Sequence, residues 1–321
     1  MKVLFVIDRM EFKWFEFNKL VTNFWIIKSM LEKSCEVWVT TIDKLSLTNQ
    51  KAYAICHKTY TKDENIFYEK EYKKTLINDF DLCMFRPDPP VDLDYINATY
   101  IFDFVDQEKT VVLNNPVAVR NFNEKLHTCM FPDLMPNHVV TSNREDILNF
   151  LKENEEIIIK PLNQCFGGGV MYLKKGDMNT SVIINSMTND STKIVMVQKY
   201  LPSARFGDKR VMMLGGKVLD YCIQKLPSNN DFKFNEHSIS NIVKAQLSEE
   251  EKENFTPLAQ KLDSMGIPLV GLDVIDGKII EINVTSPCYF INEINTYFDI
   301  HMEDIVTNFI LNCAKVNTAV N

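Results

Sequence analysis

The sequence predicts a chain of mixed class, in which an N-terminal α/β domain with a parallel sheet is followed by an α+β region. At the N-terminus, strand, helix and strand alternate, an order that is typical of a parallel sheet. Later in the chain, Gly215-Gly216 and Asp276-Gly277 each separate two apolar stretches, as the turn of an antiparallel hairpin does. The chain changes character near residue 123, where we place the first domain boundary.

Composition narrows the class of protein. The 321 residues are 45% hydrophobic, which is enough for large cores, and their formal net charge is -8. That charge, with no basic run to offset it, argues against a nucleic-acid partner. The 8 cysteines include no C-x-x-C pair and so indicate reduced thiols, not a zinc or disulfide framework. Because no apolar run reaches transmembrane length and the N-terminal apolar run is too short for a signal segment, we expect a cytoplasmic protein without a membrane partner.

The first domain is expected to open with a buried strand from Met1 to Asp8. Apolar residues then recur at helical intervals between Phe12 and Leu31, which predicts a single helix. A second strand runs from Glu36 to Thr40. The helix has more aromatic residues than one buried face needs, so it either adds a domain or subunit contact to its core packing or lines a ligand pocket.

Two further strands complete the first domain. Asp81 to Phe85 is an apolar strand that ends at Arg86, and Val111 to Leu113 is another. Ligands of open α/β sheets bind beyond the carboxyl ends of the strands. Arg86 is therefore a candidate for holding a substrate carboxylate, with a surface salt bridge as the alternative.

A glycine run follows the strand from Glu156 to Pro161, which carries Lys160 near its end. The run consists of Gly167, Gly168 and Gly169. Glycines let backbone amides approach a polyphosphate, and Lys160 adds positive charge beside them, although a flexible turn is the alternative. The loop has the spacing of neither a Walker A loop nor a dinucleotide-binding fingerprint.

The next strands carry candidate contacts to a nucleotide. The strand that begins at Lys193 runs into a proline-stopped linker, and such a linker can offer backbone groups to an adenine edge. In the strand from Gly207 to Leu214, Asp208 and Arg210 share a face, either as a local ion pair or as contacts to ribose and phosphate. Lys217 to Lys225 is the hairpin partner of that strand.

After a polar loop at 228–241 and a helix at 248–265 comes the hairpin at Asp276-Gly277, whose apolar strands are interrupted by Asp273, Glu281 and Asn283. A two-residue turn would place Asp273 opposite Ile280, whereas a three-residue loop with a left-handed Gly277 would bring the three side chains together. We predict the three-residue loop, because lone carboxylates on a buried strand would otherwise be uncompensated. Two carboxylates and an amide oxygen suit Mg²⁺, but the spacing alone fits a solvated acidic edge equally well.

Taken in order, these motifs resemble the ATP-grasp superfamily and, within it, bacterial glutathione synthetases over nearly the whole chain. The phrases that carry the resemblance are Arg86-Pro87-Asp88-Pro89-Pro90, Asn123-Glu124-Lys125-Leu126, Ile159-Lys160-Pro161-Leu162, Gly167-Gly168-Gly169, Gln198 to Pro202, Gly207-Asp208-Lys209-Arg210-Val211, Val270-Gly271-Leu272-Asp273 and Glu281-Ile282-Asn283-Val284-Thr285-Ser286-Pro287. Each phrase alone is weak, but their order and spacing are specific.

The resemblance implies a two-lobed ATP-grasp fold after the N-terminal domain, with domains at 1–122, 123–202 and 203–321. ATP would be a co-substrate, and two Mg²⁺ ions, or Mn²⁺ in their place, would be bound by Asp273, Glu281 and Asn283. The implied ATP contacts are Lys125, Lys160, Gly167, Gly168, Gly169, Gln198, Lys199, Tyr200, Leu201 and Asp208. Arg210 and Lys225 would be catalytic, and Arg86, Asn235 and Ser286 would contact the substrates.

Four departures from the family pattern lie at the end that would hold the peptide substrate. Lys225 stands where the family usually has arginine, and the loop from Ser228 to His237 has no glycine. After Pro287 the chain has Cys288, Tyr289, Phe290 and Asn292 in place of small residues and an arginine. The first-domain helix offers Phe15-Glu16-Phe17-Asn18 where the family has a short Lys/Asp/Ser phrase.

The resemblance thus implies a Mg²⁺- and ATP-dependent carboxylate–amine ligase that acts through an acyl phosphate and joins γ-glutamylcysteine to glycine. A ligase of the same chemistry with another acid or amine is the first alternative, and a nucleotide-binding regulator that no longer ligates is the second. Its partners would be peptide and amino-acid substrates. Members of the family are commonly homo-oligomers, and we expect one here.

Overall fold

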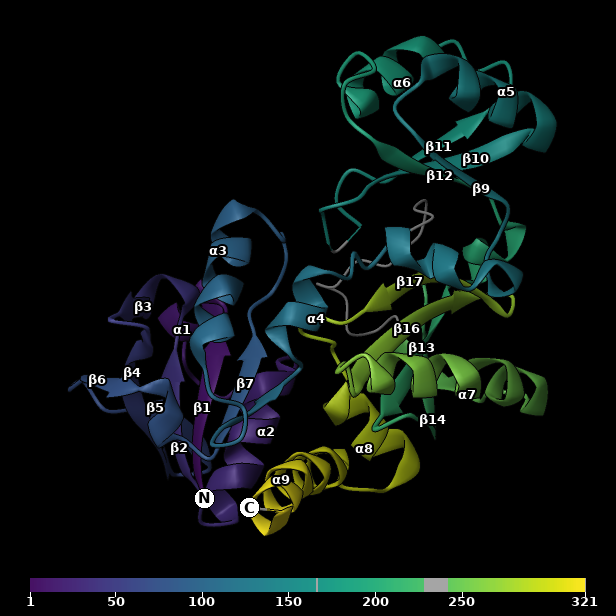
Figure 1. Cartoon of the computed structure of the whole chain (residues 1–321). Coiled ribbons are helices and arrows are strands. Elements are labelled where there is room, and N and C mark those ends of the chain that lie inside the picture. Colours follow the sequence, from purple (N-terminus) through teal and green to yellow (C-terminus); the bar gives the residue numbers. More distant parts are fainter. Residues whose placement is uncertain (166, 228–241, 321) are drawn as a thin grey trace.

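The computed structural model describes residues 1–165, 167–227 and 242–320, with side chains described as far as Lys315. Three sheets organise this part of the chain (Figure 1). The third sheet lies beside the first, and the second sheet with its two helices stands apart at one end of the molecule. The mixed α/β class expected from the sequence is confirmed.

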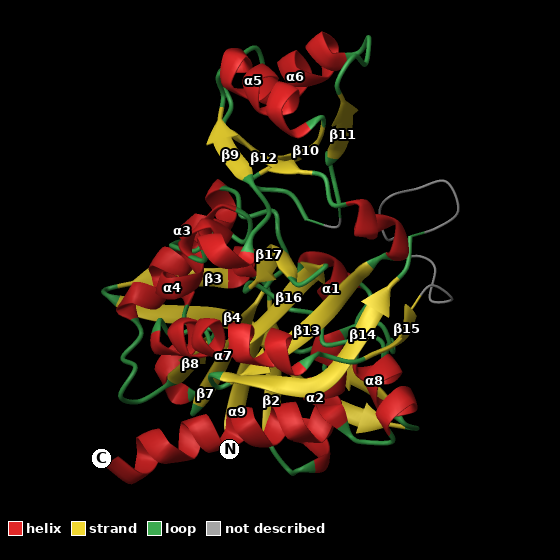
Figure 2. Cartoon of the chain, turned by 90° about the vertical axis from the view of Figure 1, so that its right-hand side faces the viewer, coloured by secondary structure: helices red, strands yellow, loops and turns green. Residues whose placement is uncertain are grey.

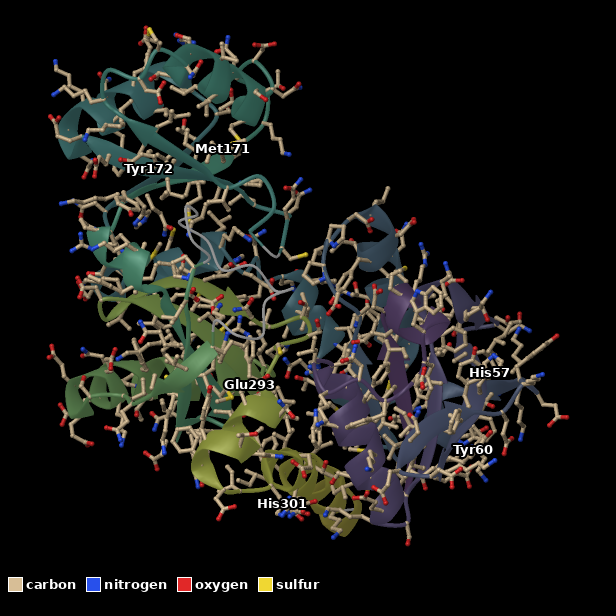
Figure 3. The ribbon with its side chains drawn as sticks, turned by 180° about the vertical axis from the view of Figure 1, so that it is seen from behind. His57, Tyr60, Met171, Tyr172, Glu293 and His301 are labelled. Atoms are coloured by element: carbon tan, nitrogen blue, oxygen red, sulfur yellow. The ribbon has the colours of Figure 1, made fainter. Side chains whose placement is uncertain are left out.

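The first sheet has the strand order β3-β4-β2-β1-β7-β8, and β5 and β6 also pair with β4. Strands β1, β2, β7 and β8 are parallel, whereas β4 joins β2 in an antiparallel edge that carries His57 and Tyr60 (Figure 3). The strands are β1 (Lys2–Ile7), β2 (Glu36–Thr40), β3 (Leu45–Thr48), β4 (Lys51–Lys62), β5 (Asn65–Tyr68), β6 (Lys73–Leu76), β7 (Leu82–Arg86) and β8 (Val111–Leu113). The helices are α1 (Arg9–Lys13), α2 (Thr22–Glu32), α3 (Leu93–Ile101) and α4 (Pro116–Arg120).

Strand β1 is buried on both faces, which explains its unbroken apolar run. Phe5 packs in one core with Phe24 of α2, and Leu4 packs in another with Tyr95 of α3. Ile7 is in register with Arg86 at the ends of the parallel strands β1 and β7. Both strands therefore deliver their next residues to the same edge of the sheet, where the site lies.

The single helix predicted between Phe12 and Leu31 is wrong, because α1 and α2 are separate helices with residues 14–21 between them. The Asn18 side chain accepts a hydrogen bond from the Leu20 N–H at 3.0 Å, a local contact that competes with helix formation. The Asn65 side chain accepts another from the Phe17 N–H at 2.6 Å. That second contact joins residues far apart in sequence, so the helical periodicity gave no sign of it.

The second sheet is antiparallel throughout, with the order β11-β10-β12-β9. Its strands are β9 (His138–Thr141), β10 (Glu156–Pro161), β11 (Met171–Lys174) and β12 (Val195–Lys199). Helices α5 (Arg144–Asn154) and α6 (Thr180–Thr188) cover its outer face (Figure 1). The strand predicted from Glu156 to Pro161 is confirmed, and it places Lys160 on the side of the sheet that faces the rest of the molecule.

The third sheet is also antiparallel, with the order β15-β14-β13-β16-β17. Its elements are β13 (Asp208–Leu214), β14 (Lys217–Lys225), β15 (Ile242–Ala245), α7 (Glu249–Ser264), β16 (Leu269–Ile275), β17 (Lys278–Asn283), α8 (Ile291–Phe298) and α9 (Met302–Val320). Both predicted hairpins and the predicted helix at 248–265 are present. In the described part of the chain, no helix combines the length and the apolar character that a membrane span requires.

Two connections fasten the first sheet to the third. Helix α9 packs against α2, as Figure 2 shows at the base of the molecule. The buried Asn114 side chain, directly after β8, donates to the carbonyl oxygens of Leu269 at 2.7 Å and Val284 at 2.8 Å and accepts from the Leu269 N–H at 3.0 Å. The carboxyl edge of the first sheet is thereby held against the strands that carry the candidate site.

Candidate active site

A cavity of about 510 Å³ lies where the three sheets meet. Every predicted site residue that the structure describes lines it, except Gly169. The predicted residues in the wall are Arg86, Lys125, Lys160, Gly167, Gly168, Gln198, Lys199, Tyr200, Leu201, Asp208, Arg210, Lys225, Asp273, Glu281, Asn283 and Ser286. Asn235 and the rest of the loop at 228–241 lie outside the described residues.

The hairpin that carries Asp273 turns more tightly than the sequence suggested. Ile275 pairs with Lys278, so the loop between β16 and β17 consists of Asp276 and Gly277 alone. Both loop residues have positive φ angles, of 56° and 71°, as a two-residue hairpin turn requires. The predicted three-residue loop is therefore wrong.

A β-bulge nevertheless brings the predicted side chains together. The register shifts between Asp273 and Val274, so that Asp273 faces Glu281 and Ile280 is the extra residue of β17. The bulge leaves the Ile280 carbonyl oxygen to accept a hydrogen bond from Lys160 Nζ at 3.3 Å. Asn283 lies next to the pair, with its amide nitrogen 3.3 Å from Asp273 Oδ2.

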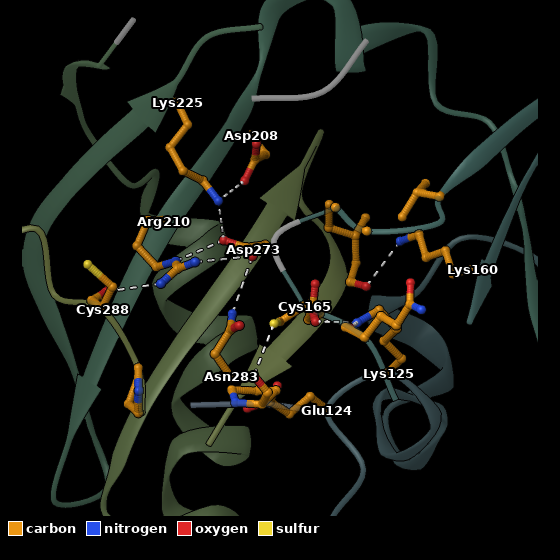
Figure 4. A pocket seen from close by; sticks show the side chains of 18 of the residues that line it. Glu124, Lys125, Lys160, Cys165, Asp208, Arg210, Lys225, Asp273, Asn283 and Cys288 are labelled. Carbon is orange, nitrogen blue, oxygen red and sulfur yellow. Dashed lines mark hydrogen bonds and ion pairs between the residues drawn. The ribbon is translucent and has the colours of Figure 1, made fainter. Parts of the chain in front are cut away.

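The Asp273 carboxylate is 6% exposed and is bound by two cations (Figure 4). Its Oδ1 accepts from Arg210 Nε and Lys225 Nζ, both at 2.8 Å, and its Oδ2 accepts from Arg210 Nη2 at 3.2 Å. Burial alone would raise the pKa of Asp273, but the two cations outweigh burial and hold the pKa well below its usual range. The carboxylate is thus ionised throughout the neutral pH range.

Lys225 joins Asp273 to a second carboxylate. Asp208 and Lys225 are in register on β13 and β14, and Lys225 Nζ lies 2.6 Å from Asp208 Oδ2. Burial raises the pKa of Asp208 to about 6, because it exceeds the attraction of Lys225. The strand can start this close to Lys225 only at a glycine, since a Cβ on Gly207 would lie 1.9 Å from the Lys225 carbonyl oxygen.

Two lysines face the other carboxylate of the hairpin. Lys125 lies just before η4 (Leu126–Met130), a short 3₁₀ helix, and its Nζ is 2.7 Å from Glu281 Oε1. Burial would lower the pKa of Lys125, but Glu281 raises it above its ordinary value. For Lys160 burial dominates and lowers the pKa to about 8, with Glu281 opposing the shift.

Strand β12 presents a buried amide nitrogen for which the described residues offer no acceptor. Gln198 is 2% exposed, lines the cavity, and finds no hydrogen-bond acceptor for its Nε2 among the described residues. A buried, unpaired amide is costly, typically by about 1–3 kcal/mol. Lys199, Tyr200 and Leu201 continue the same wall.

The end of the cavity next to the first sheet is acidic. Arg86 donates to the Asn23 side chain and, at 3.0 Å, to the Pro287 carbonyl oxygen. Asn23 in turn donates to Glu11 Oε2 at 2.8 Å. Burial, with a contribution from Asp88, raises the pKa of Glu11 to about 8. The predicted residue Ser286 donates its hydroxyl to Asp88, whose pKa burial also raises.

Four carboxylates in the wall were not predicted as site residues: Glu11, Asp88, Glu124 and Glu293. Asp88 and Glu124 stand inside phrases that carried the resemblance, so their adjacency to Arg86 and Lys125 was an available signal. Glu124 Oε1 accepts from the Val284 N–H, the Thr285 N–H and the Thr285 hydroxyl, at 2.7, 3.0 and 3.0 Å. Glu11 on α1 and Glu293 on α8 follow from no motif, and Figure 3 labels Glu293.

The unusual residues after Pro287 divide between the core and the site. Tyr289 is fully buried and donates its hydroxyl to the Met213 carbonyl oxygen at 2.9 Å, so it supports the third sheet. The Cys288 carbonyl oxygen accepts from Arg210 at 3.0 Å, and the ring of Phe290 lies 5.4 Å from the Arg210 guanidinium. This segment therefore positions Arg210 from the side opposite Asp273.

Comparison with known proteins gives the same family for both parts of the chain. The family model for the prokaryotic glutathione synthetase N-terminal domain matches residues 1–120, and the model for the prokaryotic glutathione synthetase ATP-grasp domain matches residues 124–299. The glutathione synthetase of Vibrio vulnificus is 37% identical over 240 residues, which cover 74% of this chain and 75% of the relative. That of Neisseria meningitidis is 33% identical over 297 residues, which cover 90% of this chain and 92% of the relative.

Solved structures with little sequence identity share the fold. D-cycloserine synthetase DcsG superposes with a TM-score of 0.67 at 13% identity, covering 99% of this chain and all of that one. D-alanyl-alanine synthetase A from Vibrio cholerae gives a TM-score of 0.59 at 14% identity over 97% of this chain and 99% of that one. The family models and the curated relatives together establish that the chain belongs to the prokaryotic glutathione synthetase family, and it is an ATP-dependent, C–N bond-forming ligase with an ATP-grasp domain.

Proposed function

We propose that the protein joins γ-glutamylcysteine to glycine, with ATP consumed in the cavity between the three sheets. The observation that carries this proposal is that one cavity collects Lys125, Lys160, Arg210 and Lys225 together with the carboxylates of the Asp273 hairpin. Four cations around one space suit the transfer of a phosphoryl group, whose catalysis depends on positioning and on charge stabilisation. We name γ-glutamylcysteine as the acid and glycine as the amine because the chain belongs to the glutathione synthetase family.

ATP lies in our proposal against the second sheet. Lys125 and Lys160 bind its phosphates together with Gly167, Gly168 and Gly169, and Asp208 faces the ribose. Gln198, Lys199, Tyr200 and Leu201 hold the adenine. The unpaired, buried Nε2 of Gln198 supports this placement, because an acceptor on the adenine ring would satisfy it.

The proposed metal ligands are Asp273, Glu281 and Asn283. Their donor set fits a hard cation, because carboxylate and amide oxygens are what Mg²⁺ and Mn²⁺ take, and the β-bulge places all three on one face of the hairpin. Two ions bound here would neutralise phosphate charge during the transfer. Within the described residues, no group of three or more His, Cys, Asp or Glu side chains is placed to hold a metal ion.

The reaction proceeds in two displacements. The substrate carboxylate attacks the γ-phosphorus of ATP, which releases ADP and forms an acyl phosphate. The amine then attacks the acyl carbon, the tetrahedral oxyanion collapses, and inorganic phosphate leaves while the nitrogen loses its proton. Arg210 and Lys225 stabilise the charge that develops on the phosphoryl group and the oxyanion. Arg86, Ser286 and Asn235 hold the acid and the amine.

A ligase with another acid or amine is the second candidate. Glu11 favours it, because a partly buried carboxyl group on the first-domain side of the cavity is a recognition element that no family phrase contains. Solved structures with the same fold are named for different products, D-cycloserine and D-alanyl-alanine among them. The fold therefore does not distinguish the two candidates, and the residues that contact the acid and the amine must do so.

We further propose an N-terminal domain at 1–122 and two ATP-grasp lobes at 123–202 and 203–321. We place the protein in the cytoplasm as a homo-oligomer that acts on peptide and amino-acid substrates, without nucleic-acid or membrane partners. Cross-linking and light scattering of the purified protein test whether it is an oligomer. A monomer at micromolar concentration would contradict this part of the proposal.

A substrate panel tests the proposed reaction. The purified protein is given Mg²⁺ and ATP, and phosphate release is measured with γ-glutamylcysteine plus glycine and with other acidic peptides and amino acids. We expect the first pair to give the highest kcat/KM, with the tripeptide identified by mass spectrometry. Stronger turnover with another acid or amine would favour the second candidate. If none of the pairs gives phosphate release, both candidates are contradicted.

A further inference from the structure

The side chains around Asp273 occupy its carboxylate fully. A carboxylate offers about four lone-pair positions. Asp273 uses them for four donors: Arg210 Nε and Lys225 Nζ on Oδ1, and Arg210 Nη2 and Asn283 Nδ2 on Oδ2. A divalent cation can therefore reach this carboxylate only when one of the donors leaves.

The second proposed metal ligand, Glu281, is also paired with a lysine. Glu281 Oε1 is 2.7 Å from Lys125 Nζ, which also donates to the Gln164 carbonyl oxygen at 2.5 Å. Around the two ligands, the carboxylates in the wall are Glu124, Asp208, Asp273 and Glu281, and the cations are Lys125, Lys160, Arg210 and Lys225. The charges of these buried or half-buried groups balance without any ligand, so a metal ion entering alone would leave uncompensated positive charge.

Lys225 is the donor best able to leave Asp273. Arg210 is fixed by its two bonds to Asp273, by the Cys288 carbonyl oxygen and by the ring of Phe290. Lys225 carries a single point charge on a flexible stem and already touches Asp208 at 2.6 Å. It can therefore give up Asp273 and keep a carboxylate partner.

We propose that Lys225, assisted by Lys125, is a resident counter-ion that occupies the metal-binding carboxylates until a divalent cation and an anionic phosphate arrive together. This proposal rests on the metal site proposed above. The metal takes the place of the ammonium groups on Asp273 and Glu281, and the phosphates accept the displaced ammonium groups. Metal and nucleotide then strengthen each other's binding, and because binding free energies are linked, the factor is the same in both directions.

Mn²⁺ binding, measured by the electron paramagnetic resonance signal of the free ion, tests this coupling. Wild type and Lys225→Met are titrated with Mn²⁺, first without nucleotide and then with a saturating non-hydrolysable ATP analogue. The Mn²⁺ that the analogue binds in the absence of protein is measured separately and subtracted. We expect Lys225→Met to bind Mn²⁺ at least about ten-fold more tightly than wild type without nucleotide, a shift of about 1.4 kcal/mol. The factor by which the analogue tightens Mn²⁺ binding should be smaller in Lys225→Met than in wild type, by a similar ratio.

Matched variants make each outcome decisive. Lys209→Met removes a lysine from the same strand as Asp208, where it pairs with Glu251 at 2.8 Å outside the cavity wall, and it should leave Mn²⁺ affinity unchanged. If Lys225→Met does not fold by circular dichroism, Lys225→Arg serves instead and should weaken Mn²⁺ binding without nucleotide, because the guanidinium stays on the carboxylate. Unchanged or weaker Mn²⁺ binding by folded Lys225→Met, with binding lost in Asp273→Asn, would overturn the counter-ion role and leave the metal site standing. Unchanged binding in Asp273→Asn would instead overturn the metal site itself.

Discussion

The two ends of the cavity compensate their buried carboxylates in opposite ways. At the hairpin end, Asp273 lies 2.8 Å from Arg210 and Glu281 lies 2.7 Å from Lys125. At the first-domain end, the partner of Glu11 is the neutral Asn23 amide, 2.8 Å away. The pKa values diverge accordingly, since Asp273 is held below its usual range while burial raises Glu11 to about 8.

This difference separates the two tasks of the cavity. The ion-paired carboxylates of Asp273 and Glu281 at the hairpin end suit a polyanion whose charge does not change between substrates. The first-domain end can exchange a proton near neutral pH, and its Arg86 is already engaged by Asn23 and the Pro287 carbonyl oxygen. We therefore expect phosphoryl transfer to depend on the hairpin end and substrate choice to depend on the first-domain end.

Removing Asp273 should have the largest effect. In Asp273→Ala, Arg210 and Lys225 remain buried without their carboxylate, and loss of one partner from a buried ion pair costs about 3 to 5 kcal/mol. Urea denaturation measures this loss, and ligase activity should fall below detection. Asp88→Ala is the matched change at the other end, where a neutral hydroxyl is the partner, and should cost about 1 kcal/mol. Equal losses at both ends would remove the distinction between them.

Replacing an arginine by lysine should separate the two ends kinetically. Arg210→Lys keeps the charge but loses the fork that spans both oxygens of Asp273, so we expect kcat to fall by about 10² to 10³. Arg86→Lys should mainly raise KM for the acid, because Arg86 lies at the first-domain end. Steady-state kinetics with each substrate varied in turn distinguishes these results, with the exposed Arg205→Lys as control. A pure KM effect for Arg210→Lys would contradict its role in the chemical step.

Glu124 lies between the two ends and should show an intermediate effect. Its Oε1 accepts three hydrogen bonds from Val284 and Thr285, and its carbonyl oxygen accepts a fourth from the Ile282 N–H at 3.0 Å. Glu124→Ala should cost about 2 to 3 kcal/mol and raise KM for ATP, because Lys125 is its neighbour. Glu124→Gln keeps an acceptor oxygen and should lose less than about 1 kcal/mol by thermal or urea denaturation. Equal losses in the two variants would mean that the bonds to Oε1 do not hold the strand.

The sequence predicted elements well where a local rule governs them. The parallel strands, the hairpin partners and the lysine at the end of β10 each follow from apolar runs and turn residues. The helix between Phe12 and Leu31 failed because Asn65, from another part of the chain, binds the Phe17 N–H. Periodicity measures only which residues would share a helix face and contains no information on such a distant hydrogen bond.

The site shows the same limit. Asp273 and Glu281 were expected together for reasons of charge, and they do face each other, but through a bulge at Ile280 and not through the loop that was predicted. The sequence around a bulge has no strong local pattern that predicts it. The need to compensate buried charge, in contrast, can be inferred from the charged residues within an apolar strand. Glu11 was missed because it lies on the short helix α1, just after β1, and belongs to no motif that the sequence offered.

The pH dependence of stability should reveal the smallest of these effects. The folded protein keeps the proton of Glu11 up to about pH 8, whereas the unfolded chain releases it near the ordinary value of 4.5, so stability falls as pH rises through that interval. Glu11→Gln has no proton to release and should therefore lose less stability than wild type between about pH 5 and pH 8. Urea denaturation across this range measures the slope, with the exposed Glu32→Gln as the control for a lost charge. Parallel pH profiles for wild type and Glu11→Gln would show that this carboxyl group is charged in the folded protein, and the first-domain end would then hold a fixed negative charge instead of an exchangeable proton.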